Sequence, residues 1–395
     1  MLRVLTLATL FPDASRPNFG VFVERQTLGL AAHPDVELRV VAPIGVPPFP
    51  LTRLAPYAPL AALPRHEHWR GVEVHRPRFL NLPATAGRWH APLLARALAP
   101  LLVRIRRDFP FDVIDAEFFF PDGPAAVALG RRFGVPVSIK ARGADIHHWG
   151  RSPATASQVR AAGRSADGLL AVSQAMVADM AALGIPADRI RVHSTGIDRS
   201  RFGTHSRSQA KAALGIDGPL VASLGALIPR KGHDIVAEAV AALPGVALWI
   251  VGEGPERGRL EAQIAASPAR DRIRLLGALP HADLPRLLAA ADAMALASSS
   301  EGLANAWVEA LASGTPIVIP DAGGAREVVT SPDAGRIVAR NPVAFAEALA
   351  ALLADPPHAD AVKATAERFS WDANRDALYA HLQGLVAARR TQSSG

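Results

Sequence analysis

The chain has 395 residues, 49% hydrophobic and 20% charged, a balance that supports packed cores and excludes a disordered chain. It contains no cysteine, which excludes a disulfide framework and a thiolate metal site and fits a reducing compartment. The net charge of +7 lies in the first half of the chain. Residues 1–198 carry 23 Lys and Arg against 16 Asp and Glu, whereas residues 199–395 carry 20 basic and 20 acidic residues. We therefore expect the two halves to meet different partners.

The N-terminal run MLRVLTLATLF is followed by a proline rather than by a small-residue cleavage site. It lacks the basic start of a signal sequence, and we interpret it as a first buried strand. No apolar run approaches the roughly 20 residues of a membrane-spanning helix. We therefore expect a cytoplasmic location.

Short β-branched apolar runs alternate with helical periodicity along the first half. The strand-like runs lie at 2–9, 36–42, 112–116, 135–140 and 168–172. The helical patterns fill 20–32, 91–107, 123–133 and 173–183. This alternation is typical of βαβ units, which build a parallel sheet with both faces covered by helices.

The second half repeats the pattern after a polar, glycine-containing joint, HSTGIDRSRFGTHSRSQ. Its strand-like runs are PLVASLG, VALWIVG, RIRLLG, DAMALAS, TPIVIP and GRIVA. We predict an α/β protein of two doubly wound Rossmann-like domains that face a central cleft. Open parallel sheets bind ligands at the carboxyl ends of their strands, so both domains are expected to direct their binding edges at that cleft.

Two loops in the second half favour phosphate binding. In GALIPRKGHD, Gly225 ends a strand, Arg230 and Lys231 lie in the loop, and Gly232 opens the next helix. Adjacent cations beside a helix N-terminus suit a diphosphate; the alternative is a solvated basic loop. The glycine pair in VGEGPERGRLE permits a tight bend and close backbone approach, although by itself the pair favours an ordinary turn.

The stretch SSSEGLANAWVEALASGTPIVIP places two glutamates around the start of a helix. We expect that helix to begin at 304–306, with Glu301 just before it and Glu309 in its first or second turn. A carboxylate in the apolar run WVEALA is costly without hydrogen-bond donors, and sugar and ribose hydroxyls are such donors. Backbone N–H groups of residues 303–305 lie at the positive helix end. The pattern favours a nucleotide sugar over the alternative of a dipole-favoured Glu301 with Glu309 on a wet face.

These motifs resemble those of retaining glycosyltransferases of family 4, which have the GT-B fold. EGLANAWVEALASGTPIVIPDAGGAREVV is similar to the family's region of two glutamates eight positions apart, and it is the most specific part. GALIPRKGHD, VGEGPERGRLE, TLFPDASRPNFGVFVERQTLGLAA, SIKARGADIHHWG and the tail FSWDANRDALYAHLQGL match in order and spacing. The resemblance, of a polysaccharide-building or teichuronic-acid type, covers nearly the whole chain.

The resemblance implies an N-terminal acceptor-binding domain at 1–198, to which a last helix at about 371–390 returns, and a nucleotide-sugar-binding domain at 199–370. It implies that Lys231 contacts the donor diphosphate, Glu301 the transferred sugar and Glu309 the ribose. The full set of donor-binding candidates is Arg230, Lys231, Gly302, Leu303, Ala304, Asn305 and Glu309. On the acceptor side the candidates are Asn18, Phe19 and Gly20.

Two departures from the family pattern affect the expected chemistry. The family commonly has Arg after the glycine that ends the first C-domain strand, whereas this chain has Ala226; Arg230 is the candidate replacement. The family often has His-Gly-x-Asp where this chain has Arg142-Gly143-Ala144-Asp145. Arg adds a fixed cation that cannot act as a base at neutral pH.

The expected reaction is transfer of a sugar with retention of its anomeric configuration, helped by cations and amide dipoles on the leaving diphosphate. No Asp-x-Asp cluster or His-rich spacing is present to hold a metal, so no metal or other cofactor is expected. The catalytic candidates are Glu301, Asp145 and Arg142. Neither carboxylate is assigned as a covalent nucleophile, and a front-face route with the leaving phosphate as base is equally open.

Residues 65–107 carry nine Arg against two Glu. The Leu-rich part of this region is HAPLLARALAPLLVRIRRDF. It fits a helix that lies on anionic lipid at the inner face of the cell membrane, which suits a lipid-linked acceptor. It also fits a helix that faces the core and leaves its Arg side chains in solvent. Pro100 is expected to interrupt it. Nucleic acid is not an expected partner, because aromatic interleaving and DNA-binding motifs are absent.

Two other functions remain open at the sequence level. A nucleotide-sugar epimerase with the same fold would need no acceptor pocket, and the Pro-rich insert at 43–64 favours a mobile acceptor loop instead. A non-enzymatic nucleotide-sugar sensor would not need the intact glutamate pair. An NAD enzyme is not expected, because no G-x-G-x-x-G follows a first strand.

Overall fold

The computed structural model describes residues 1–17, 19–55 and 57–394. The chain divides into two compact units. The first unit is Met1–Gly196 together with the C-terminal segment from Trp371, and the second is Ile197–Ser370. Among the described residues, no helix has both the length and the apolar character needed to cross a membrane.

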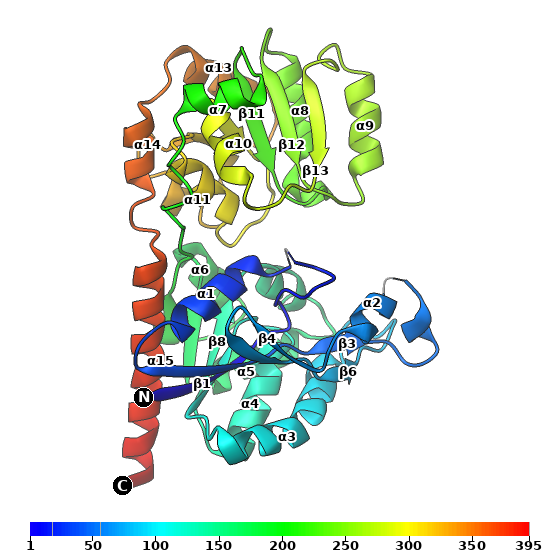
Figure 1. Cartoon of the computed structure of the whole chain (residues 1–395), viewed down its shortest axis with the longest axis vertical. Coiled ribbons are helices and arrows are strands. Elements are labelled where there is room, and N and C mark those ends of the chain that lie inside the picture. Colours follow the sequence, from blue (N-terminus) through cyan, green and yellow to red (C-terminus); the bar gives the residue numbers. More distant parts are fainter. Residues whose placement is uncertain (18, 56, 395) are drawn as a thin grey trace. The chain divides into compact units, whose positions relative to one another are not determined.

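The first unit is built on an eight-stranded sheet in the order β10-β9-β8-β7-β1-β2-β5-β4 (Figure 1). The strands are β1 (Leu2–Leu7), β2 (Val36–Val41), β4 (His66–Trp69), β5 (Val72–His75), β7 (Val113–Ala116), β8 (Val137–Ala141), β9 (Gly168–Ala171) and β10 (Ile190–Val192). Only β4 runs antiparallel to its neighbour. The five strand-like runs of the first half are all strands of this sheet, so that prediction is confirmed.

Helices cover this sheet in two layers, one containing α3, α4 and α5 and the other α1 and α15 (Figure 1). The helices of the unit are α1 (Val21–Ala31), η1 (Leu51–Arg53), α2 (Tyr57–Ala62), α3 (His90–Asp108), α4 (Asp122–Phe133), η2 (Asp145–Trp149), α5 (Ala156–Ser165), α6 (Gln174–Ala182), η3 (Ala187–Arg189) and α15 (Trp371–Ser394). The last helix packs Leu378, Leu382 and Val386 into the same core as β1. The chain therefore returns to its first unit through its last helix.

Helix α3 shows how its sequence pattern is used. Buried residues recur every three or four positions, at Ala91, Leu94, Leu98, Leu102 and Ile105, so its apolar stripe faces the core against α4. The alternative of a core-facing helix with solvated Arg is the one that the structure supports. The expected interruption at Pro100 is wrong: the helix runs through it, because packing of the flanking turns offsets the one lost backbone bond.

The region between β2 and α3 contains more regular structure than the sequence predicts. The insert at 43–64 is not a plain loop, since it holds β3 (Ile44–Val46), which pairs with β6 (Arg78–Leu80), as well as η1 and α2. The β4–β5 hairpin follows it. Short edge strands rich in His, Glu and Arg carry little of the hydrophobic alternation by which strands are recognised.

The second unit contains a six-stranded parallel sheet in the order β13-β12-β11-β14-β15-β16 (Figure 1). Its strands are β11 (Leu220–Leu224), β12 (Ala247–Val251), β13 (Ile273–Gly277), β14 (Ala293–Ala295), β15 (Ile317–Pro320) and β16 (Gly335–Val338). Each lies within one of the six predicted runs. The order reverses beside β11 and β14, which makes their carboxyl ends the switch point where open α/β sheets bind ligands.

The helices of the second unit also form two layers, α8, α9 and α13 in one and α7, α10, α11 and α14 in the other. They are α7 (Arg207–Leu214), η4 (Pro229–Lys231), α8 (His233–Ala241), α9 (Arg257–Ala265), α10 (Leu284–Ala290), α11 (Asn305–Ala312), α12 (Ala325–Val328), α13 (Pro342–Ala354) and α14 (Ala359–Thr365). Both units are thus doubly wound α/β folds, which confirms the predicted fold class.

Candidate donor site

The loop after β11 brings two cations to the switch point. Gly232, between η4 and α8, has φ +65°, and a Cβ there would lie 2.3 Å from the carbonyl oxygen of Ala297. Only glycine tolerates both that backbone conformation and that contact. Arg230 and Lys231 immediately precede it, so the close approach fixes the basic loop against the segment that follows β14.

The segment that follows β14 supplies the carboxylate that faces this loop. The Glu301 side chain is 9% exposed; its Oε1 lies 2.5 Å from Lys231 Nζ, and its Oε2 lies 3.5 Å from a guanidinium nitrogen of Arg230. Arg230 also donates to the carbonyl of Ser300. The predicted cation pair and the first predicted glutamate therefore meet in one cluster.

A glycine after β15 holds the Glu301 backbone from behind. Gly323 has φ +54°, and a Cβ on it would lie 2.0 Å from the Glu301 carbonyl oxygen. The next residue, Gly324, donates its N–H to the Gly302 carbonyl at 2.8 Å. The Gly-Gly of DAGGAREVV, to which sequence reasoning gave no role, thus positions the turn that carries the carboxylate.

Helix α11 begins at Asn305, inside the expected range of 304–306. Leu303 and Ala304 are buried, and within the described chain no group accepts a hydrogen bond from the N–H of Leu303, Ala304 or Asn305. Such N–H groups carry the positive end of the helix dipole and bind anions. They lie directly after Glu301 in the chain, which makes this turn a place for a phosphate or a sugar hydroxyl.

Glu309 lies in the second turn of α11 and is buried. Its Oε1 lies 2.8 Å from His281 Nε2, and the His281 ring makes an edge contact with Phe202 at a centroid distance of 5.5 Å. The carboxylate thus has a protein partner that sequence reasoning did not single out. His281 stands in a loop between β13 and α10, 28 positions from its partner, so no local pattern announces the pair.

His233 is a second residue that the sequence interpretation missed. It opens α8, is 2% exposed, and pairs its Nδ1 with the Ser223 hydroxyl at 2.9 Å. Burial lowers the pKa of His233 to about 4, and the positive charge of Lys231 acts in the same direction. The imidazole is therefore neutral at physiological pH and supports the basic loop without adding charge to it.

We expect the second unit to lose stability on acidification through this residue. The unfolded chain protonates His233 near its ordinary pKa of 6.5, whereas the folded chain resists protonation down to about 4. The contribution of His233 to the free energy of unfolding is thus complete above pH 6.5 and lost as the pH falls to 4, in total on the order of 3 kcal/mol.

Urea denaturation between pH 7 and 4.5 should show that the free energy of unfolding depends less steeply on pH in His233→Gln than in the wild type. The exposed His358→Gln variant should retain the wild-type slope; equal slopes for all three proteins would contradict the prediction.

In the first unit, Arg142 belongs to a buried polar network. Its guanidinium donates to the Glu117 carboxylate and, at 2.6 Å, to the Glu117 carbonyl. Lys140 Nζ lies 2.6 Å from both Gln26 Oε1 and His193 Nδ1. Burial holds the pKa of Lys140 well below its usual range. Gln26 comes from α1, whereas the other members lie at the carboxyl ends of β7, β8 and β10. Arg142 is tied to its own unit by its ion pair with Glu117.

Asp145 has no exposed surface. Its carboxylate accepts hydrogen bonds from the backbone N–H groups of Phe119 (2.9 Å), Arg142 (3.0 Å) and Gly143 (2.7 Å). Burial raises its pKa, which these backbone bonds oppose. The geometry makes Asp145 a clamp for the turn that carries Arg142.

The acceptor-side candidates lie in the loop before α1. Asn18 is outside the described residues, and Phe19 is 36% exposed with the Arg16 guanidinium 4.3 Å from its ring centre. Gly20 has φ +72°, and a Cβ there would lie 2.5 Å from the Leu10 carbonyl oxygen. The backbone conformation and the close contact within its own loop therefore explain why a glycine stands at position 20, without reference to a ligand.

Comparisons with known proteins decide the family. Residues 20–201 match the family model described as Glycosyltransferase Family 4, and residues 206–369 match the one described as Glycosyl transferases group 1. The chain belongs to glycosyltransferase family 4. The matches begin one residue before α1 and end two residues before the last helix, so this family 4 enzyme carries both parts of the fold.

Two relatives match most of the chain. This family 4 enzyme is 28% identical to the putative teichuronic acid biosynthesis glycosyltransferase TuaC of Bacillus subtilis, over 82% of each chain. It is 29% identical to a GDP-mannose-dependent alpha-mannosyltransferase of Mycobacterium tuberculosis, over 82% of this chain and 85% of that one.

Solved structures share the fold. Sucrose-phosphate synthase from Thermosynechococcus elongatus superposes with a TM-score of 0.82 at 20% identity, over 98% of this chain and 100% of that chain. Anabaena HepE in complex with UDP gives 0.74 at 20% identity, over 97% and 100%. This family 4 glycosyltransferase therefore has the GT-B fold.

Proposed function

We propose that this glycosyltransferase is a retaining, metal-independent hexosyltransferase that moves a sugar from a nucleotide-diphosphate sugar to a glycan or lipid-linked acceptor. The observation that carries the proposal is the cluster of Lys231, Arg230 and Glu301 beside the unpaired amides at the start of α11. Cations, a carboxylate and a helix N-terminus at one switch point match the charges of a sugar diphosphate.

Lys231 and Arg230 would neutralise the diphosphate. An ammonium group has three N–H donors, so Lys231 can keep one on Glu301 and direct another at a phosphate oxygen. When the bond between the anomeric carbon and the diphosphate oxygen breaks, negative charge grows on that oxygen. A cation already fixed there by Glu301 stabilises the charge without reorganisation.

The two glutamates would accept hydrogen bonds from hydroxyl groups of the donor. Glu301 would accept from the transferred sugar. Glu309 has Oε1 engaged by His281, which leaves Oε2 to accept from a ribose hydroxyl. The His281 contact would orient the carboxylate before the donor arrives, which reduces the entropy cost of binding.

In the first unit we assign Asp145 a positioning role, because its oxygens are occupied by backbone amides. Arg142 would supply a fixed positive charge on the acceptor side. Neither residue is placed as a nucleophile. Retention then proceeds by a front-face route in which the leaving phosphate accepts the acceptor's proton.

A role in cell-surface polysaccharide synthesis is supported by similarity to a relative named for teichuronic acid biosynthesis. The assay is a panel of UDP-, GDP- and ADP-sugars incubated with polysaccharide and polyprenyl-linked acceptors, with and without EDTA. The proposal expects transfer with retained anomeric configuration, unaffected by EDTA. Epimerised donor without transfer would show an epimerase, and donor binding without turnover a sensor; either result overturns it.

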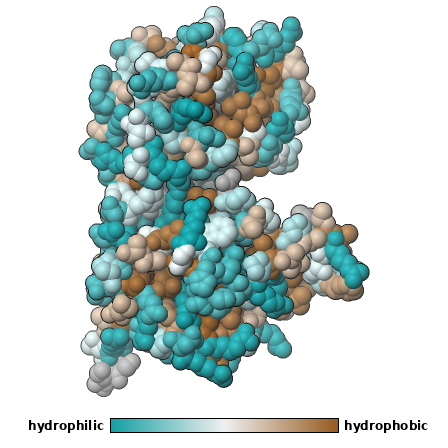
Figure 2. Space-filling model, in the orientation of Figure 1, coloured by the Kyte–Doolittle hydropathy of each residue, from teal (hydrophilic) through white to brown (hydrophobic). Residues whose placement is uncertain are grey.

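We further propose that the first unit contacts the anionic lipid surface at the inner face of the cell membrane. Phe49 and Leu54 are 70% and 55% exposed, and the Arg53 guanidinium lies 4.8 Å from the Phe49 ring centre. The segment around α2 stands away from the sheet in Figure 1, and Figure 2 shows apolar atoms among polar ones on it. Apolar side chains next to Arg suit a lipid headgroup layer.

We expect the protein to float with anionic liposomes at low salt and less at high salt. The double variant Phe49→Ser/Leu54→Ser should weaken binding by about tenfold or more, because each lost side chain removes apolar burial. Val343→Ser, which removes another exposed apolar residue (67% exposed) from the second unit, should bind as wild type does. Wild-type flotation that salt does not change would end the proposal.

A further inference from the structure

The β4–β5 hairpin of the first unit places four possible metal-binding side chains on one face. In the antiparallel register, His66 lies opposite His75 and His68 opposite Glu73. Since side chains alternate between faces along a strand, all four share one face. Val72 and Val74, at the intervening positions of β5, are buried on the other face. The proposed donor site uses none of these residues.

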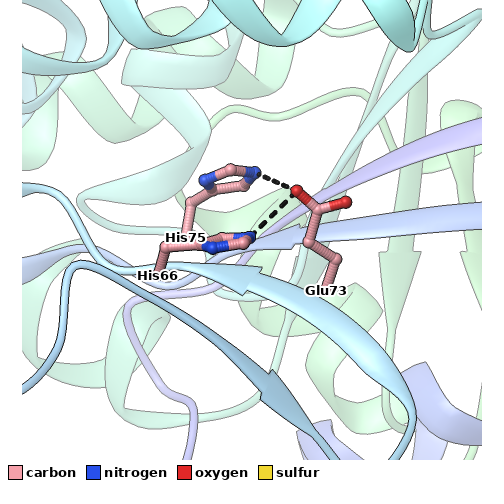
Figure 3. A group of neighbouring side chains, drawn as sticks. All are labelled: His66, Glu73 and His75. Carbon is pink, nitrogen blue, oxygen red and sulfur yellow. Dashed lines mark hydrogen bonds and ion pairs between the residues drawn. The ribbon is translucent and has the colours of Figure 1, made fainter.

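Three of these groups converge on a single point. His66 Nε2 and His75 Nε2 each lie 3.0 Å from the same carboxylate oxygen, Glu73 Oε1, and all three atoms lie within 4.8 Å of one another. Figure 3 shows both rings turned toward that oxygen from neighbouring strands. Tetrahedral zinc, with bonds of about 2.0–2.1 Å, requires ligand atoms roughly 3.3 Å apart. The two His–Glu distances of 3.0 Å are within a few tenths of an ångström of that spacing, and the two ring nitrogens, no more than 4.8 Å apart, would draw together around an ion.

The pairing inside this cluster is incomplete without an ion. His75 Nε2 is buried and has no hydrogen-bond partner among the described residues, although it meets the distance of an ion pair with Glu73. A buried ring nitrogen without a hydrogen bond is costly. A metal ion would take the lone pairs of both imidazoles and of the carboxylate together, which removes that cost.

Neighbouring groups orient the carboxylate and balance its charge. Glu73 Oε2 lies 2.9 Å from Arg39 Nε, which leaves Oε1 to the two histidines. Arg39 is in turn paired with Asp108 at 2.8 Å, so its positive charge is offset. With neutral imidazoles, the two carboxylates and one guanidinium carry a net charge of −1, which favours a cation. Outer-shell partners of this kind hold metal ligands in place.

We propose that His66, Glu73 and His75 form a binding site for a divalent transition-metal ion of the zinc class, which ties the edge strand β4 to β5. Two imidazoles and one carboxylate suit zinc. Mg²⁺ and Ca²⁺ prefer ligand sets made only of oxygen atoms, so this set disfavours them. The fourth ligand falls to His68, whose ring centre lies 5.9 Å from that of His66, or to water. This inference does not depend on the proposed function.

Metal uptake by the full-length protein, prepared without a polyhistidine tag and stripped with EDTA, tests the proposal. With Zn²⁺ as the probe, one equivalent should remain bound after desalting, and Mg²⁺ should not compete. His66→Gln and His75→Gln should each weaken Zn²⁺ binding by at least about tenfold. His358→Gln, which removes an exposed histidine 3.9 Å from a carboxylate in the second unit, should bind as wild type does. Absence of zinc uptake, or uptake equal in all variants, overturns the proposal.

A second measurement keeps the test valid if a variant folds poorly. In the wild type, Zn²⁺ at 100 times its dissociation constant should slow hydrogen exchange of the β4 and β5 amides and raise Tm by about 5 °C. Protection confined to other elements would contradict the site. Because uptake is measured without donor, it stands or falls separately from transfer, which is expected to survive EDTA.

Discussion

Replacing Lys231 with alanine should lower the rate of sugar transfer by at least about 100-fold, with the main effect on kcat. The charge on the departing diphosphate grows as the bond to the sugar breaks, and loss of a preorganised group that stabilises such charge typically costs two to three orders of magnitude. Arg230, 3.5 Å from Glu301, is farther from the carboxylate and should not replace it. Initial rates with the active donor, at saturating donor, give kcat directly.

The matched control is Lys363→Ala. Lys363 lies in the same unit and is paired with Asp360 at 3.5 Å on the surface, so its loss should leave turnover unchanged. Because Lys231→Ala leaves the buried Glu301 short of a partner, Lys231→Arg is needed as well: it keeps the charge and should recover part of the rate. Wild-type turnover in a well-folded Lys231→Ala protein would remove Lys231 from the mechanism.

Glu309→Gln should weaken donor binding by about 10- to 100-fold and raise KM more than it lowers kcat. A hydrogen bond to a charged group contributes about 1.5–3 kcal/mol. A ribose contact is also the same in the ground state and the transition state, so its loss acts on binding. Titration calorimetry with the nucleoside diphosphate measures this loss without turnover.

A ribose-modified ligand makes this prediction specific. Nucleoside diphosphates lacking the 2′- or the 3′-hydroxyl should bind more weakly than the parent to the wild type, while Glu309→Gln should no longer distinguish one of them from the parent. Glu347→Gln, at an exposed position on α13, should behave as wild type does. If the Lys231→Ala/Glu309→Gln double variant folds and turns over normally, the proposed donor site is wrong.

Much of the donor site could be predicted from the sequence because its parts are local. The run from β14 to α11 sets Glu301 before a helix and Glu309 in its second turn, and helix periodicity alone gives that spacing. The position of Arg230 and Lys231 could also be predicted, because the alternation of strand-like and helical patterns places their loop at the end of β11. The meeting of Lys231 with Glu301, 70 positions apart, agrees with the rule that parallel strands bring their carboxyl ends to one edge.

The parts that the sequence did not predict depend on contacts between distant segments. The pairing of His281 with Glu309 and the Gly323 contact behind Glu301 each join loops from different βα units, and the burial of His233 depends on the packing around the start of α8. No local periodicity encodes such pairs.

By itself, then, the sequence determined two α/β units, their strands and the residue types of a sugar-diphosphate site, because alternation and turn chemistry are written in neighbouring residues. Only the tertiary structure decided that the Asp145 carboxylate accepts hydrogen bonds from backbone N–H groups and that Pro100 stays within a helix. It alone also brought His66, Glu73 and His75 to one point. The reason is physical: burial, strand register and packing against other elements set the partner of a polar side chain, and these exist only once the chain has folded.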